Sequence, residues 1–232
     1  MKERPIIFND DMVRAILDGR KTMTRRPVKG VMPDNGLWLK KPTKTRSGIT
    51  THVIDAPKHG LCPFGAIGDR IWVREAFSTL GNEDGCPIDW NNHLVKEGGP
   101  DAARIYRASC EQKSGNYGLW SIPDDAFWKP HTDDMQYEGS WTPSIHMPRW
   151  ASRITLEITD VRIERLQDIT EDDARYEGVT LSNPRILLHR DEFRQLWGEI
   201  YGCDGWRSNP WVWVIAFRRV DTGCAAGASK GE

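Results

Sequence analysis

The first recurrent apolar positions lie near the N-terminus and follow helical spacing, at Met12, Val13, Ile16 and Leu17. Residues three and four apart share one face of a helix, so the run predicts a short amphipathic helix. Asn9 or Asp10 can cap its start, and Gly19 follows where a left-handed C-cap belongs. The pattern therefore predicts a helix that is clearly bounded at both ends.

Three later stretches predict strands. Residues 71 to 74 alternate after a Gly68-Asp69 turn, and residues 153 to 163 alternate with an irregularity that indicates a possible β-bulge. Residues 211 to 217 are apolar on both faces, which is typical of a strand covered on both sides, as in the wall of a small covered barrel.

Two further helices follow from capping signals and spacing. Thr170 begins a short helix, with Asp173 as a variant capping box and Gly178 as its stop. A longer amphipathic helix is predicted from about residue 186 to residue 201. Because strands and helices do not alternate regularly, the fold class predicted is α+β with a barrel-like sheet.

The remaining chain carries little periodicity. Residues 27 to 58 are rich in Pro, Gly, Lys and Thr and predict a long loop. Residues 78 to 150 interrupt the pattern as an insertion with one predicted strand at 104 to 108, and the small residues from Thr222 onward predict a disordered tail.

Composition limits the protein class. The chain has 232 residues, 38% of them hydrophobic and 28% charged, which indicates one large globular domain or a domain with an insertion. No apolar run is long enough for a membrane span, and the N-terminal residues do not form a secretory signal, so we expect a cytoplasmic protein.

Neither cysteine nor histidine spacing predicts a bound metal. The five cysteines are widely spaced and form no C-x-x-C pair, which favours free thiols over a zinc site or a disulfide framework. His59 and Cys62 are three residues apart, but no second pair accompanies them. We expect no metal and no cofactor.

Positive charge is concentrated near the N-terminus. Between Arg20 and Arg46 there are nine Lys or Arg residues and one acidic residue, Asp34, although the formal net charge of the chain is only -1. Such a cluster favours a phosphate-bearing partner. Of the eleven tryptophans, five lie between residues 90 and 150; most are expected to pack, and one or two could stack on a base.

Several of these segments together resemble the ASCH domain family, which is similar to the PUA domains of RNA-modifying proteins. The matching motifs are Gly19-Arg-Lys-Thr-x-Thr24, Gly68-Asp-x-x-x-Val73, Leu166-x-x-Ile-Thr-Glu171 and Glu177-Gly-Val179. The resemblance covers residues 6 to 29, 64 to 77 and 151 to 220, and long versions with an insertion resemble proteins of tailed phages and prophages.

The resemblance implies a PUA-like small β-barrel with rim helices and a cleft for RNA or a modified nucleoside. On this interpretation, residues 1–77 and 151–220 form the ASCH domain, residues 78–150 are a loop-rich insertion, and residues 221–232 are a flexible tail. A phage-encoded protein of this kind would work in the host cytoplasm, and its insertion could bind a host protein.

The resemblance also implies an activity, the removal of an acyl group from N4-acetylcytidine or a related modified base. Lys21 would then be the base, Thr24 the nucleophile or its positioning hydroxyl, and Glu177 the group that orients Lys21 or relays a proton. Substrate or phosphate binding would fall to neighbouring polar residues, namely Arg20, Thr22, Arg25, Arg26 and Glu75.

These roles make demands on the structure. Lys21 and Thr24 are three apart, so they share a face only if the backbone between them turns or bulges. Lys21 acts as a base only when neutral; burial and the nearby arginines would lower its pKa, and Glu177 would raise it. The simpler interpretation makes Glu177 part of a solvated helix face and leaves the basic side chains in solvent.

Other functions fit the same residues. The chain could be a non-catalytic reader of single-stranded nucleic acid that uses the basic cluster and the insertion tryptophans. It could also be a ribonuclease, since the ASCH resemblance alone does not select one activity. A third alternative is a phage accessory protein whose exposed tryptophans bind a host protein.

Overall fold

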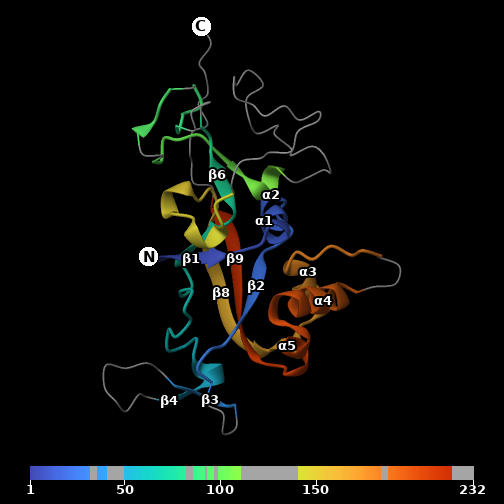
Figure 1. Cartoon of the computed structure of the whole chain (residues 1–232). Helices are drawn as coiled ribbons and strands as arrows, with labels where there is room; N and C mark the ends of the chain where they lie inside the picture. Colours follow the sequence, from blue (N-terminus) through green and yellow to red (C-terminus); the bar gives the residue numbers. More distant parts are fainter. Residues whose placement is uncertain are drawn as a thin grey trace.

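The structure is a computed structural model that describes residues 1–31, 36–40, 50–81, 86–91, 93–96, 99–110, 141–183 and 188–220. Its centre is a mixed five-stranded sheet with the strand order β1-β5-β8-β9-β2 (Figure 1). β1 and β5 are parallel, and the other neighbours are antiparallel. The strands span Glu3–Ile7 (β1), Arg70–Arg74 (β5), Thr155–Arg165 (β8), Trp211–Val220 (β9) and Met23–Pro27 (β2).

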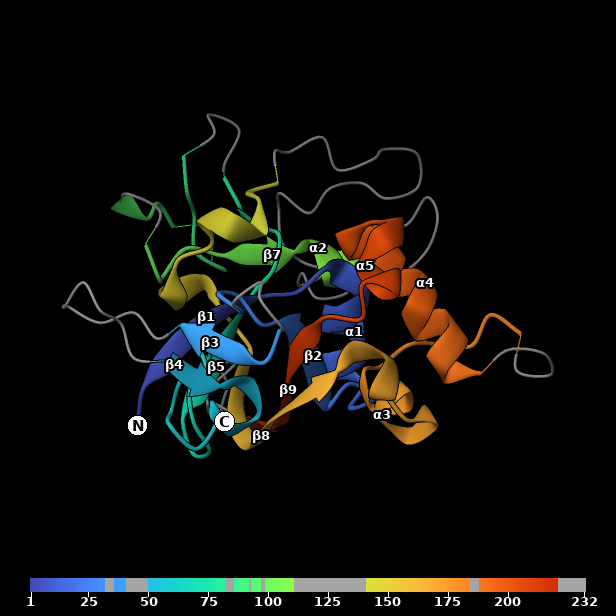
Figure 2. The same ribbon diagram turned by 90° about the horizontal axis from the view of Figure 1, so that it is seen from below.

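Helices cover both faces of the sheet. Both faces of β9 are therefore buried, which explains why its sequence is apolar on both sides. Trp213, Ile215 and Phe217 face a hydrophobic cluster that includes α1, whereas Val212 and Val214 face a second cluster that includes α3 and α4. Figure 2 shows α3, α4 and α5 together on one side of the sheet. The helices span Asp10–Leu17 (α1), Glu171–Tyr176 (α3), His189–Tyr201 (α4) and Cys203–Arg207 (α5).

The capping residues predicted from the sequence begin α1 and α3 in the structure. Asn9 Oδ1 accepts a hydrogen bond from the backbone N–H of Met12 at 2.9 Å, which confirms the predicted N-cap of α1. Thr170 Oγ1 accepts from the N–H of Asp173 at 3.1 Å at the start of α3. These caps satisfy amide groups that the first helical turn leaves without partners.

The long central strands also agree with the pattern. The register of β8 against β9 shifts between Ile158 and Asp160, which confirms the predicted bulge. In β9, residues Val212 to Ile215 are all buried between β8 and β2, as the apolar run predicts. The α+β class is therefore confirmed.

The sheet does not close into a barrel within the described residues, because its edge strands β1 and β2 do not pair. The predicted loop at 27 to 58 also differs from the structure. It contains a two-stranded sheet of β3 (Trp38–Lys40) and β4 (Thr50–His52). Each strand is only three residues long, which is too short to show an alternation of apolar and polar residues in the sequence. Leu39 is buried there and secures the pair to the core.

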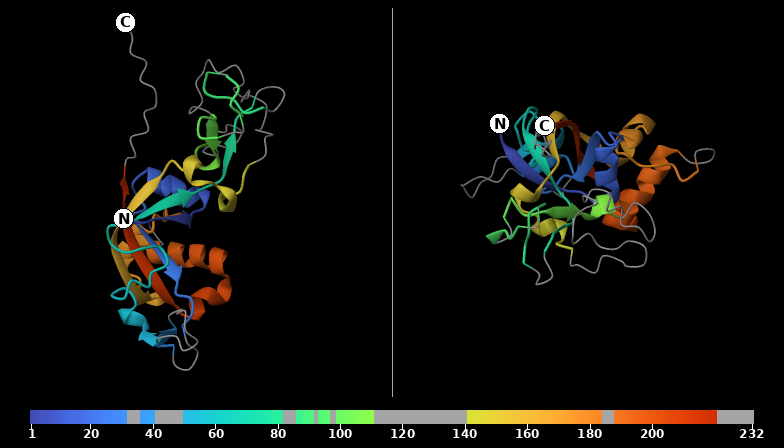
Figure 3. Two further views of the ribbon diagram at one scale, coloured as in Figure 1. Left: turned by 90° about the vertical axis from the view of Figure 1, so that its left-hand side faces the viewer. Right: turned by 90° about the horizontal axis from the view of Figure 1, so that it is seen from above.

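In the chain between β5 and β8, the described residues form a further two-stranded sheet and a short helix, which together make one small unit. β6 (Phe77–Thr79) pairs with β7 (Arg104–Tyr106), and α2 (Arg107–Cys110) follows, so the strand predicted at 104 to 108 is shorter than expected. Figure 3 shows this unit and the β3–β4 pair at opposite ends of the sheet. Short 3-10 helices span Val53–Asp55, Ser144–His146, Arg149–Ala151 and Leu166–Asp168.

Some expectations fall on residues outside the described ranges. These are the flexible tail at 221–232, much of the insertion at 111–140 and the first residues of the predicted helix at 186–187. Among the described residues, no helix has both the length and the apolar character needed to span a bilayer.

The two-sided burial of β9 predicts a large cost for shortening one of its side chains. Ile215→Ala should destabilise the protein by about 2–5 kcal/mol, because it removes buried methyl groups and leaves a cavity. Urea unfolding followed by circular dichroism measures the change. Ile54, which is 52% exposed, supplies the matched control: Ile54→Ala should stay within about 0.5 kcal/mol, and equal losses at both positions would contradict the assigned burial.

Candidate functional site

The segment that carries Lys21 is held between α1 and α3 by backbone hydrogen bonds. The N–H of Lys21 donates to the carbonyl of Ala15 at 2.9 Å, and the N–H of Thr22 donates to the carbonyl of Tyr176 at 2.9 Å. β2 begins only at Met23, so Lys21 lies outside the strand. The end of α3 is thereby joined to the chain that leads from α1 into β2.

Gly178 allows the end of α3 to lie very close to α1 and to Lys21. Its φ of +83° lies in the left-handed region, and a Cβ at this position would lie 2.7 Å from Lys21 Cβ and 2.9 Å from Ala15 Cβ. Any larger residue would push α3 away from α1. The glycine therefore brings the preceding residue, Glu177, against Lys21.

Lys21 and Glu177 form a buried ion pair. Lys21 Nζ lies 2.7 Å from Glu177 Oε2 and 2.8 Å from the backbone carbonyl oxygen of Glu177. Both side chains are almost completely shielded from solvent. The Phe8 ring centroid lies 5.6 Å from Nζ, so one side of the ammonium faces an aromatic ring.

Burial lowers the pKa of Lys21 below its usual value of 10.5, because the charged ammonium loses its hydration. The adjacent Glu177 carboxylate opposes this change, while the positive charges of Arg26 and Arg25 act in the same direction as burial. The balance favours a lysine that releases its proton more readily than one in solvent. A lowered pKa is what a general base near neutral pH needs.

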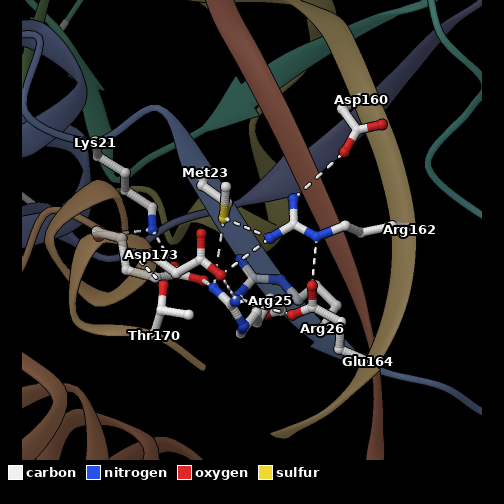
Figure 4. Close-up of polar contacts among 10 residues, drawn as sticks. Lys21, Met23, Arg25, Arg26, Asp160, Arg162, Glu164, Thr170 and Asp173 are labelled. Carbon is white, nitrogen blue, oxygen red and sulfur yellow. Dashed lines mark hydrogen bonds and ion pairs between the residues drawn. The ribbon is translucent and has the colours of Figure 1, made fainter. Parts of the chain in front are cut away.

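A cluster of charges surrounds the pair on the α3 side of the sheet. Arg25 is buried, and its Nη2 lies 2.7 Å from Asp173 Oδ2 and 3.1 Å from Glu164 Oε2. Its Nη1 lies 3.4 Å from Glu177 Oε1. Figure 4 shows Arg25 and Arg162 approaching Asp173 from β2 and β8.

The sequence pattern did not predict that these charged residues form one cluster. Its only sequence signal is that Asp160, Arg162 and Glu164 recur at a spacing of two along β8, which places them on one face of the strand. The spacing does not reveal that Arg25, two strands away across β9, lies on the same face. The cluster fixes Arg25 between carboxylates, so its guanidinium is already neutralised within the protein.

Thr24 lies on the other face of β2. It pairs with Ile215, whose side chain belongs to the α1 cluster, whereas its neighbour Arg25 pairs with Val214, which belongs to the α3 cluster. The Thr24 hydroxyl is buried and has no hydrogen-bond partner among the described residues. The structure therefore brings Lys21 and Glu177 together and leaves the Thr24 hydroxyl free of both.

The other basic residues of the motif have distinct surroundings. Arg20 is paired with Asp18 at 3.0 Å and also donates to the carbonyl of Gly178 at 2.9 Å. Thr22 is exposed. Arg26 Nη2 donates to the carbonyl of Ile7 at 2.8 Å, and its guanidinium lies 5.2 Å from the Phe8 ring centroid.

Glu75 belongs to a second ion pair rather than to the Lys21 pair. Its two carboxylate oxygens accept hydrogen bonds from Arg153 Nε at 3.0 Å and Nη2 at 2.9 Å. Burial raises the pKa of Glu75, and Arg153 opposes that change. Arg153 also lies over the Tyr106 ring, 4.1 Å from its centroid, so the pair joins the sheet to the unit that follows β5.

Glu177 is also one of the residues that line a surface hollow. The hollow has a volume of about 360 Å³ and lies between α1 and α4, with Gly178 and Thr180 at its edge. Within the described residues, no group of three or more His, Cys, Asp or Glu side chains is arranged to hold a metal ion.

The close approach at Gly178 can be tested with a matched glycine. Gly178→Ala and Gly19→Ala both place a side chain at a positive φ directly after the C-cap residue of a helix, the values being +83° and +75°, but nothing lies within 4 Å of the new Cβ at Gly19. Gly19→Ala should cost about 1–2 kcal/mol from backbone conformation alone. Gly178→Ala should cost clearly more in urea unfolding; equal costs would show that the contact with Lys21 relaxes easily.

Comparison with known proteins supplies no relative: the chain matches no protein family, no curated protein and no solved structure.

Proposed function

We propose that the chain is an ASCH-type hydrolase that removes the acyl group from an N4-acylated cytidine or a related modified base. The observation that carries the proposal is the contact between Lys21 Nζ and Glu177 Oε2, 2.7 Å apart in space and 156 residues apart in the sequence. These are two of the three residues on which the ASCH resemblance places catalysis. Their burial matches what a base with a lowered pKa requires.

The proposed chemistry is amide hydrolysis at an exocyclic nitrogen. Neutral Lys21 takes a proton from the attacking oxygen, which belongs either to water or to the Thr24 hydroxyl, and that oxygen forms a bond to the acyl carbon. The C–N bond then breaks, and the protonated Lys21 returns its proton to the leaving amine. Glu177 orients Lys21 throughout and stabilises its ammonium while the proton is held there.

Thr24 has two possible roles that leave different traces. As the nucleophile, it would carry the acyl group as an ester before water releases it; as a positioning group, it would only hydrogen bond to the attacking water. Its buried hydroxyl without a partner supports a role that involves a ligand or water, since an unsatisfied buried hydroxyl costs about 1–3 kcal/mol.

The proposal includes a PUA-like fold. The support is that the edge strands β1 and β2 approach one another although they do not pair: Arg26 in β2 donates its Nη2 hydrogen bond to Ile7 in β1 at 2.8 Å. The sheet is therefore curled enough for one side chain to bridge its two edges.

A second function is favoured by one observation. Lys21 Nζ is fully buried, and its two hydrogen-bond acceptors both belong to Glu177. Such a pair could be purely structural, in which case the chain would bind nucleic acid without cleaving a bond. Measuring acetate release separates this non-catalytic reader from the hydrolase, and a gel of labelled single-stranded RNA detects the ribonuclease alternative.

Loss of the Lys21 amine should slow catalysis strongly if the proposal holds. Incubation with N4-acetylcytidine should release acetate, and Lys21→Met should lower kcat/KM by about 10²–10⁴-fold, the usual contribution of a general base. Because Lys21→Met removes the nearest positive charge from a buried carboxylate, the Lys21→Met/Glu177→Gln double variant is the matched control for folding. Equal rates in wild type and in both folded variants would remove the assignment.

The pH dependence should report the environment of Lys21. Since neutral Lys21 is the active form, kcat/KM should rise with pH and level off above its pKa, which lies below 10.5. Arg26→Gln removes a positive charge that lowers this pKa, so the rising limb should move to higher pH. Arg218→Gln, at a 69% exposed side chain, should leave the limb in place; an unmoved limb in Arg26→Gln would exclude Lys21 as the titrating group.

A further inference from the structure

Two adjoining hollows lie on the β2 side of α4, beyond the candidate site. One has a volume of about 500 Å³ and the other about 630 Å³, and they share Arg26, Phe64 and Tyr201 in their walls. Both volumes fall in the range of ligand-binding pockets. We call the combined space the basic groove, and define it by Arg26, Lys29, Arg74, Phe64, Tyr201 and Trp213.

The basic groove is electrostatically unlike the hollow at Glu177. Its walls contain Arg26, Lys29 and Arg74, and no acidic side chain among the described residues lines it. Nε of Arg74 is buried without a hydrogen-bond partner in the described part of the chain. The hollow at Glu177, in contrast, is lined by five acidic residues, Asp11, Asp18, Glu177, Glu192 and Glu199. An anionic ligand would therefore enter from the Arg26 side.

Aromatic side chains in the basic groove are suited to stacking. The Tyr201 ring packs on Trp197 with centroids 4.3 Å apart and an interplanar angle of 36°. Tyr201 is nevertheless 37% exposed, so one part of the residue is held by the core while another faces the groove. Phe64 and Trp213 add apolar surface nearby. Aromatic platforms combined with positive charge are typical of sites for single-stranded nucleic acid.

The basic groove and the buried ion pair border a common small hollow. Arg26 and Tyr201 also border a small hollow that Glu177 and Arg25 line, beneath the apolar face of α4. Lys21 and Arg26 both lie against the Phe8 ring, at 5.6 and 5.2 Å from its centroid. Only a few side chains, Arg26 and Phe8 among them, would therefore separate a ligand in the groove from Lys21.

We propose that the basic groove binds the nucleotides that flank the target base, so that the substrate is a single-stranded polynucleotide rather than a free nucleoside. Phosphates would meet Arg26, Lys29 and Arg74, and a neighbouring base would stack on Tyr201. The position of the target base rests on the proposed hydrolase function. Strand binding in the groove rests only on the charges, rings and hollows described above.

Fluorescence anisotropy with labelled single-stranded RNA and DNA without acetylated bases tests strand binding separately from hydrolysis. Tyr201→Ala should weaken binding about 5- to 150-fold, the size of one base–aromatic stack, while Tyr201→Phe should retain it. Lys29→Gln should reduce the slope of log K against log salt concentration by about 0.7. Arg218→Gln, outside the groove, should change neither quantity. Thermal unfolding verifies that each variant is folded.

Binding of either single strand that depends on Tyr201 and Lys29 supports the proposal. Absence of binding, stronger binding of a duplex, or equal binding by all variants overturns it, even if N4-acetylcytidine is hydrolysed. Conversely, groove-dependent binding with no hydrolysis of any acetylated substrate would refute the hydrolase and leave the strand-binding groove intact. If both hold, kcat/KM for an acetylated oligonucleotide should exceed that for the nucleoside, and Lys29→Gln should reduce that preference.

Discussion

The packing of α3 against the segment after α1 requires the close approach that Gly178 allows, and the buried ion pair depends on that packing. Moving two charges out of water is unfavourable unless their geometry is good and their remaining hydrogen bonds are made. Lys21 meets this condition through both the side chain and the backbone carbonyl of Glu177. The protein thus holds a buried lysine without leaving its charge unpaired.

The same constraint explains the larger charge cluster. Arg25 points toward the α3 side of the sheet because strand alternation places it opposite Thr24, and there it would be an isolated buried cation. Asp173 and Glu164 supply the opposite charge from α3 and β8. Breaking a buried pair by removing one partner usually costs about 3–5 kcal/mol, so the cluster ties β2, α3 and β8 together.

The space around α4 divides by charge. On one side, the hollow that Glu177 lines is rich in carboxylates; on the other side, the basic groove carries arginine, lysine and aromatic residues. Arg26 stands at the boundary, since it contacts Phe8 and lines the groove. Of the arginines expected to meet phosphate, Arg26 is thus the one whose surroundings suit that role, because Arg20 and Arg25 already face carboxylates.

The sequence by itself determined the elements whose causes are local. The caps of α1 and α3, the bulge in β8 and the two-sided burial of β9 all follow from side chains close together in the chain. Tertiary structure alone decided which charges meet. Residues 21 to 26 show the same positive character in sequence, yet one lysine is buried on a glutamate, one arginine on a carboxylate cluster and another faces a groove. Their partners come from distant segments, and no local spacing encodes a contact made across 156 residues.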